Sequence, residues 1–274
     1  MYRIYPVIIF FTCVFTLISC RQKEAESKKH FLQANEYLFK DDLDNAKKEY
    51  EIAIQIDTTN WQACYELAGV YQLQGDLKDA LFYFSKTIQL NPGYASGYFG
   101  RANLEETTGD EKASMKDLKE AIAHKRDFFS AWLAKGRKDF GKGNFKEAVN
   151  DLDTAIKLRP DFYMAYSMRG SVKFKSGDFN GAISDFSEEI AQSPGQVMGY
   201  VNRSLAYGEQ KNYRAAINDI NLAIAQDPLW SQAYIYRGMY YFRSGVKDSA
   251  CGDFRIAYKL HNPEAEAYSK EYCK

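Results

Sequence analysis

The side chains of this 274-residue chain that could carry chemistry are mainly cations and carboxylates at a fixed spacing. In five successive segments an Arg or Lys is followed, always at the same interval, by an Asp. The pairs are Arg101 and Asp117, Lys135 and Asp151, Arg169 and Asp185, Arg203 and Asp219, and Arg237 and Asp253. Such a ladder could grip a partner or form internal, partly buried ion pairs. Because the two signs occur together segment by segment, we favour internal pairs, whose loss reduces stability more than binding.

Other residue types give little support for catalysis or metal binding. The histidines His30, His124 and His261 lie far apart and share no ligand spacing with Cys or carboxylates, so we predict no metal site. The sequence has no Gly-rich phosphate loop, no Gly-x-Ser-x-Gly and no Cys-x-x-Cys. We therefore expect a protein that is not an enzyme, with no catalytic residues, no cofactor and no small-molecule substrate.

The charge balance restricts the partners. The chain has 36 Lys and Arg against 36 Asp and Glu, so its formal net charge is zero and it produces no long-range field. This argues against nucleic acid as a partner, because such binding depends on neutralising phosphates. A content of 26% charged residues with only six prolines fits an ordered protein rather than a disordered one.

The first twenty residues have the pattern of an export signal. Arg3 precedes an apolar run over residues 4–18, which suits a signal-peptide core and is short for a membrane span of about 20 residues. The run ends in Leu17-Ile18-Ser19-Cys20 and turns polar at Arg21. This junction resembles the lipobox of bacterial lipoproteins. An uncleaved anchor, or a secreted protein with a chance Cys, is the alternative.

The lipobox resemblance implies a signal peptide over residues 1–19 and acylation of Cys20, with palmitate as a typical chain. Residues 20–26 would then be the lipidated Cys and a tether that reaches at most about 20 Å. Several acyl chains on one residue suffice for stable membrane anchoring. Because Arg21 rather than Asp follows Cys20, analogy with enterobacterial sorting favours the outer membrane over the inner membrane.

In the rest of the chain, residue types recur at a constant interval, which is the interval that separates Ala46 from Ala80. Four sets of positions, here called registers, follow this interval without an insertion. The alanine register continues with Ala148, Ala182, Ala216 and Ala250, and Ser114 fills its gap. A glycine register contains Gly75, Gly109, Gly143, Gly177 and Gly245. A proline register contains Pro92, Pro160, Pro194 and Pro228, and an aromatic register contains Tyr98, Trp132, Tyr166, Tyr200, Tyr234 and Tyr268.

The period and these residue types resemble the tetratricopeptide repeat, a helix-turn-helix unit of about 34 residues. We count seven units, over residues 27–60, 61–94, 95–128, 129–162, 163–196, 197–230 and 231–264, and residues 265–274 fit a C-terminal capping helix. The resemblance implies an all-α fold, an α-solenoid wound as a right-handed superhelix. Stacking is required because one hairpin cannot bury its own aromatic residues.

Each register has a physical reason. Small residues in the first helix of a repeat, helix A, and Ala in the second, helix B, let the two helices approach closely. Gly-Asp permits the turn between them, with Asp capping helix B, and Pro ends helix B. Repeat 1 lacks the Gly and Pro, and repeat 6 has Lys211 in place of Gly. Repeat 3 has Ser114 and Arg126 in place of Ala and Pro, which we interpret as a local change of curvature.

In this family helix A lines the concave surface, and one subclass clamps a partner's carboxylate with Lys and Asn at its fifth and ninth positions. No such pairing occurs here, which disfavours a carboxylate clamp. The predicted groove is apolar and suits an extended or helical segment of a protein partner, although repeat-to-repeat packing could explain any single member. Its residues are Tyr65, Phe99, Leu133, Met164, Phe174, Val201, Ile235, Met239 and Phe242.

Three cysteines follow Cys20. Cys64 takes an aromatic register position and is predicted to be a buried core thiol. Cys251 lies on helix B of repeat 7 and Cys273 on the capping helix, so a disulfide between them is a hypothesis that the sequence leaves open.

These features together predict a non-catalytic scaffold, lipid-anchored in the bacterial envelope, that binds protein partners in its groove. One alternative is a permanent component of an outer-membrane assembly or secretion complex, and a weaker one is a protein that binds glycan or peptidoglycan.

Overall fold

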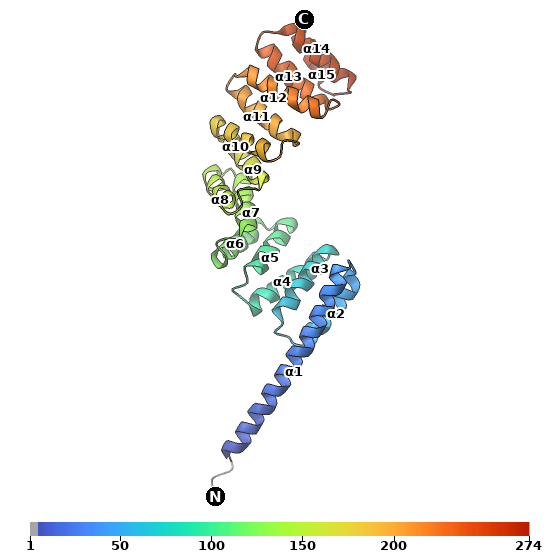
Figure 1. The fold of residues 1–274 in the computed structure, drawn as a ribbon, viewed down its shortest axis with the longest axis vertical. Helices are drawn as coiled ribbons and strands as arrows, with labels where there is room; N and C mark the ends of the chain where they lie inside the picture. The colour runs from blue at the N-terminus through green and yellow to red at the C-terminus, as the bar shows by residue number, and fades with distance from the viewer. Residues whose placement is uncertain (1–4, 274) are drawn as a thin grey trace. The chain divides into compact units, whose positions relative to one another are not determined.

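The computed structural model describes the backbone of residues 5–273 and the side chains of residues 21–273. Within these bounds the chain forms fifteen helices and no strand (Figure 1), which confirms the all-α prediction. The predicted signal peptide lies partly outside the described backbone, and the Cys20 side chain lies outside the described side chains.

The helices follow one another as antiparallel hairpins, as expected for seven repeats and a cap (Figure 1). The first compact unit, residues 1–131, contains α1 (Tyr5–Phe39), α2 (Leu43–Ile56), α3 (Trp61–Leu73), α4 (Leu77–Leu90), α5 (Ala95–Thr108) and α6 (Glu111–His124). The second unit, residues 132–274, contains most of α7 (Phe129–Gly141), then α8 (Phe145–Leu158), α9 (Tyr163–Lys175), α10 (Phe179–Gln192), α11 (Val197–Glu209) and α12 (Tyr213–Gln226). It ends with α13 (Ser231–Arg243), α14 (Lys247–Lys259) and the capping helix α15 (Ala265–Tyr272).

The first helix, α1, is longer than any other. It runs without a break through the predicted tether at residues 20–26 and into helix A of repeat 1. Ser27 fixes this junction, because its buried hydroxyl donates to the Ala53 carbonyl at 2.8 Å and accepts from Asn60 at 2.9 Å. Among the described residues, no helix is both long and apolar enough to cross a membrane.

The turns inside the repeats form as their residue types predict. Gly75, Gly109, Gly143, Gly177 and Gly245 all adopt left-handed backbone conformations, with φ between 78° and 87°. Asp76, Asp110 and Asp178 each accept a hydrogen bond from the backbone N–H three residues later, and so cap the following helix. Helix B ends two residues before each proline of the proline register, Pro92, Pro160, Pro194 and Pro228.

Small residues allow the two helices of a repeat to approach closely. A Cβ atom added to Gly170 would lie 2.7 Å from Cε1 of Phe186, and one added to Gly238 would lie 2.5 Å from Cε1 of Phe254. Both rings are buried. The glycines of helix A therefore make room for the aromatic residues of helix B, which form the core.

Candidate partner-binding surface

The structure brings every predicted ion pair together. Arg203 binds Asp219 with two parallel bonds, from Nε at 2.9 Å and Nη2 at 2.7 Å, and Arg237 binds Asp253 in the same way at 2.8 and 2.7 Å. Arg101 with Asp117 and Arg169 with Asp185 have the same two-bond geometry. Each Asp is buried and each Arg is largely covered. Hydrogen bonding to the paired Asp raises the pKa of Arg203 and of Arg237.

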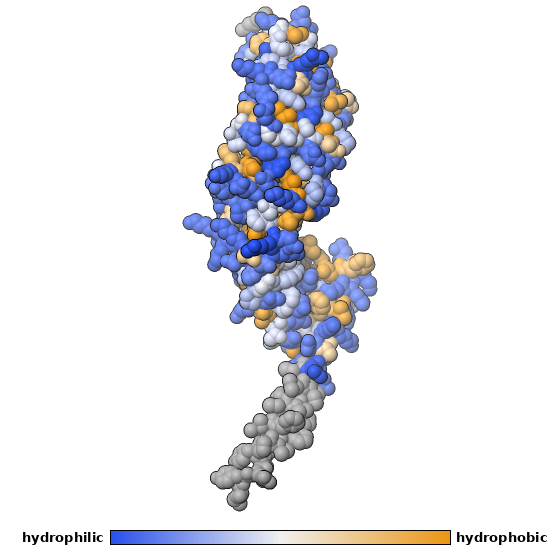
Figure 2. Space-filling model, turned by 60° about the vertical axis from the view of Figure 1, so that its left-hand side comes forward, coloured by the Kyte–Doolittle hydropathy of each residue, from blue (hydrophilic) through white to orange (hydrophobic). Residues whose placement is uncertain are grey.

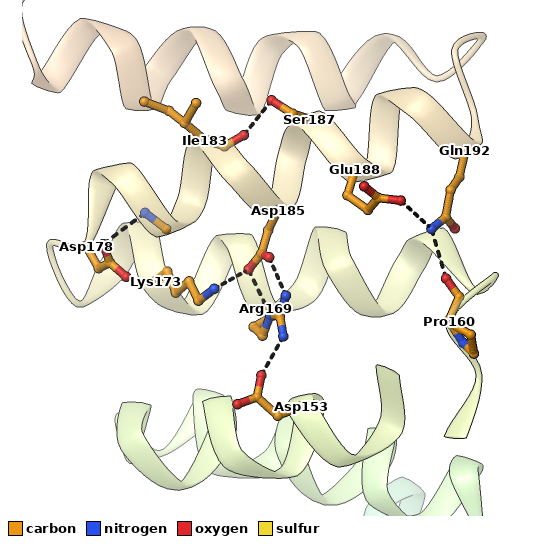
Figure 3. Close-up of polar contacts among 11 residues, drawn as sticks. Asp153, Pro160, Arg169, Lys173, Asp178, Ile183, Asp185, Ser187, Glu188 and Gln192 are labelled. Atoms are coloured by element: carbon orange, nitrogen blue, oxygen red, sulfur yellow. Dashed lines mark hydrogen bonds and ion pairs between the residues drawn. The ribbon is translucent and has the colours of Figure 1, made fainter. Parts of the chain in front are cut away.

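Each of these arginines also reaches back to helix B of the preceding repeat. The third guanidinium nitrogen, Nη1, donates a hydrogen bond to a side chain there. Arg101 donates to Ser85, Arg169 to Asp153, Arg203 to Ser187 and Arg237 to Asn221. Figure 3 shows the Arg169 guanidinium between Asp153 and Asp185. The Nζ atom of Lys173 also forms an ion pair with Asp185, at 2.9 Å. The ladder therefore joins three helices at each of these four arginines. The sequence signal was present, since each acceptor precedes its Arg by the same interval that separates the Arg from its Asp.

Lys135 departs from this arrangement. Its Nζ donates to Asp151 at 2.6 Å and to Asp139, one turn along the same helix, at 3.0 Å. Asp139 also accepts from Asn144 at 3.1 Å, and its pKa is lowered because the bonds from Asn144 and Lys135 outweigh its burial. A lysine has no fork of nitrogens, so a second carboxylate on its own helix takes the place of the three-helix bridge.

The predicted groove residues divide by burial. Val201 and Ile235 are 2% and 1% exposed, so they belong to the core and present no surface to a partner. Only Met164, at 46%, is largely exposed. The remaining members are partly buried, and most of them pack against the core clusters: Tyr65, Phe99, Leu133, Phe174, Met239 and Phe242. Tyr65, for example, makes edge contacts with Phe84 and Tyr94.

Other exposed apolar residues lie at groove positions that the sequence interpretation omitted. Met198 is 52% exposed and holds the same position of helix A as Met164, one repeat later. Phe39 and Leu73, at 92% and 68%, share the thirteenth position of helix A in repeats 1 and 2. The repeat register could have found all three. On the face seen in Figure 2, apolar patches are separated by hydrophilic side chains.

A hollow of about 760 Å³ opens in the first unit beside α1 and the turn between α2 and α3. Phe31 and Trp61 contribute apolar wall, while Lys23, Lys28 and Asn60 contribute polar wall. Trp61 and Tyr65 both contact the ring of Tyr94, with centroids 4.6 and 5.1 Å apart. Among these rings, Trp61 lines the hollow and Tyr94 supports it from behind.

The cysteines take defined places. Cys251 and Cys273 form a disulfide between α14 and the residue that follows α15, with their Cα atoms 5.7 Å apart. Cys64 is a free, buried thiol, and burial raises its pKa. The described residues contain no cluster of His, Cys, Asp or Glu suited to a metal ion.

Successive hairpins held by buried aromatic residues and an internal ion-pair ladder define a helical repeat protein, an α-solenoid. Models of the tetratricopeptide repeat match residues 30–60, 61–94, 133–197 and 199–228, together more than half of the chain. The chain belongs to the tetratricopeptide-repeat family. No curated protein matches the sequence.

Solved structures with the same fold cover most of the chain. One is the C-terminal part of a tetratricopeptide-repeat protein from Cytophaga hutchinsonii, with a TM-score of 0.73, 16% identity, and 87% of this chain and 98% of that chain covered. Another is a tetratricopeptide-repeat protein from Parabacteroides merdae, with a TM-score of 0.62, 17% identity, and coverage of 91% and 100%. A third is YrrB, described as having an unusual peptide-binding site, with a TM-score of 0.62, 20% identity, and coverage of 67% and 95%.

Proposed function

We propose that this protein is a non-catalytic, membrane-anchored scaffold that binds a segment of a protein partner along the exposed apolar side chains of its A helices. The observation that carries the proposal is the contrast between charged and apolar groups on these helices. The paired arginines are used in internal contacts, whereas Met164 and Met198 remain half exposed on successive repeats. Methionine is unbranched and adapts to irregular apolar surfaces, which suits a docking position.

Family and neighbours support this kind of activity. The tetratricopeptide-repeat fold is a scaffold for protein–protein interaction, and a structural neighbour, YrrB, is described as having a peptide-binding site. Arrays of stacked helix pairs present extended surfaces to their partners. A protein or peptide is therefore the partner class we propose, with nucleic acid disfavoured by the neutral net charge.

Binding is tested by a cross-linked pull-down from membranes with the full chain. M164A/M198A removes the exposed apolar pair, and L222A is the matched control, because Leu222 is also about half exposed but lies on helix B of repeat 6. We expect partners to be lost with the double variant and kept with L222A. Equal recovery from both variants would remove this surface from the proposal. Partners that survive high salt and detergent would indicate a permanent complex.

We further propose that Cys20 anchors the protein by lipid to the bacterial envelope, with the outer membrane favoured over the inner. The support is the Leu17-Ile18-Ser19-Cys20 junction followed by Arg21. Growth with an alkyne palmitate should label the native chain and not C20S, and C20S should move from the membrane fraction to the supernatant. C13S, with its Cys inside the apolar run, is the control and should behave as the native chain. Unlabelled native protein would contradict lipidation.

A further inference from the structure

One position of helix B is occupied by a small residue in every repeat except the fifth. At the repeat interval, this register reads Ala53, Thr87, Ala121, Ala155, Glu189, Ala223 and Ala257. Ten residues later, helix A of the next repeat provides the facing residue: Ala63, Gly97, Ala131, Ala165, Gly199 and Ala233. The facing residue is glycine only where the helix B residue is larger than alanine. The pair Glu189 and Gly199 is the extreme case.

Glu189 fills the space that Gly199 leaves. A Cβ atom on Gly199 would lie 3.3 Å from Cδ and 3.5 Å from Cγ of Glu189, and 3.0 Å from Cγ1 of Ile190. The Glu189 side chain is only 3% exposed, and its Oε2 atom has no hydrogen-bond partner among the described residues. An ionised carboxylate in such a place is costly, whereas a neutral carboxyl is tolerated far better.

The nearby charges do not compensate for ionisation of Glu189. Helix α10 packs against α9 and α11. The ionisable residues of these two helices are Tyr163, Tyr166, Arg169, Lys173, Lys175, Tyr200, Arg203, Tyr207 and Glu209, and those on α10 are Asp185 and Glu188. Arg169 and Lys173 pair with Asp185, and Arg203 pairs with Asp219. Burial raises the pKa of Glu189, and a hydrogen bond with Ser167 on α9 opposes only part of that effect.

We propose that Glu189 makes the contact between the fifth and sixth repeats pH-sensitive. Its neutral carboxyl fits against Gly199, and when it loses its proton to solvent the uncompensated charge loosens α11 from α10. Because the native pKa is raised, the contribution of Glu189 to stability is full below the ordinary glutamate value of 4.5 and is lost as pH rises towards the native value. The proposal does not depend on any partner and stands apart from the proposed function.

Hydrogen exchange of the full chain tests the proposal, with protection factors of α10 and α11 compared between pH 4.5 and pH 8 after correction for intrinsic rates. We expect opening to increase by up to about tenfold per pH unit within the titration window, since one pKa unit equals a factor of ten. In E189Q, which keeps the shape without the charge, protection should not change with pH. The exposed neighbour provides the control E188Q, which should behave as the native chain.

A second pair of variants separates charge from packing. E189A should leave a void beside Gly199, and E189A/G199A should refill it by recreating the Ala–Ala pairing found at other repeat boundaries, such as Ala155 with Ala165. We expect the hydrogen-exchange protection of the double variant to be independent of pH, and the double variant to be more stable than E189A. Equal pH dependence of protection in the native chain and E189Q, or titration of the Glu189 carboxyl at the ordinary value by carbon-13 NMR, would overturn the proposal.

Discussion

The turn between the two helices of a repeat requires a left-handed backbone conformation at one position, whichever residue type occupies it. Where glycine is replaced, the backbone keeps this conformation, with φ of 59° at Asp41 and 60° at Lys211. The hydrogen bonds of the turn persist too, since Lys211 N–H donates to Gly208 O at 3.0 Å and Asn212 N–H to Tyr207 O at 2.9 Å. A left-handed conformation costs an L residue about 1–2 kcal/mol, so both turns are strained relative to the glycine turns.

Lys211→Gly should therefore stabilise the protein. We expect a gain of about 1 kcal/mol, because relief of the left-handed strain is partly offset by the greater freedom of glycine in the unfolded chain. Lys211→Ala is the control, since it removes the exposed side chain and keeps the strain. Urea unfolding of the three proteins measures the difference. A glycine variant no more stable than the alanine variant would show that the turn carries no strain.

Glu105 should make stability depend on pH near neutrality. Burial, and next the charge of Asp117, raise its pKa to about 7, although Arg101 opposes the shift. Since the native pKa is raised, this stability is complete below about pH 4.5 and is lost as pH rises to about 7. After discounting for the solvent that reaches this side chain, the loss should be about 1–2 kcal/mol. E105Q should lose less stability between pH 5 and pH 8, as measured by thermal unfolding, whereas E36Q, at an exposed glutamate of the same unit, should follow the native curve.

At the scale of the helices, the ladder links four A helices, α5, α9, α11 and α13, to the B helices on either side of each. Arg203 holds Asp219 in its own repeat and Ser187 in the preceding one. Removing one member of such a buried pair leaves the other charge uncompensated, whereas replacing both by apolar residues is often tolerated. The energetic role of the ladder is thus best seen in the difference between single and double replacements.

A double-mutant cycle at Arg203 and Asp219 tests this role. We expect R203A to cost about 3 kcal/mol and R203M/D219L to cost clearly less, by urea unfolding. The exposed pair Glu266 and Lys270, only 2.6 Å apart, is the control, and K270A should give no measurable change because solvent screens the pair. Additive effects of R203M and D219L would show that the two side chains are not coupled.

The sequence predicts the helices well because the same residue types recur at the same turn, cap and end positions in successive repeats. Glycine, capping Asp and proline act within a few residues, so the repeat register places the turns and the paired charges. Exposure depends instead on neighbouring repeats. Val201 and Ile235 share the groove position of Tyr65, yet both are buried by their neighbours. The groove was therefore predicted less well than the fold. The pair Glu188 and Glu189 suggests a solvated helix face from sequence, but Glu189 is buried because it packs against Gly199 across the helix contact.

At the scale of the whole array, each repeat is stabilised mainly by its nearest neighbours, so the last repeat needs a cap. The capping helix α15 supplies Tyr268 and Tyr272, whose rings lie 5.5 and 6.2 Å from that of Phe254 on α14. The disulfide links Cys251 to Cys273, which are 22 residues apart in the sequence, and so closes a loop around this contact. It therefore fastens the capping helix α15 to helix B of repeat 7.

Reduction of this disulfide should weaken the C-terminal end first. A loop of this length predicts a stabilisation of about 3 kcal/mol from restriction of the unfolded chain. We expect dithiothreitol, or C251S/C273S, to lower hydrogen-exchange protection in α14 and α15 by about a hundredfold and to leave α3 and α4 unchanged, because nearest-neighbour coupling confines the effect. C64S treated with dithiothreitol controls for the buried thiol and should lose the same C-terminal protection. Unchanged protection of α14 after reduction would mean that the aromatic contacts alone hold the cap, whereas a loss extending to α9 would mean that the second unit unfolds as a single cooperative block.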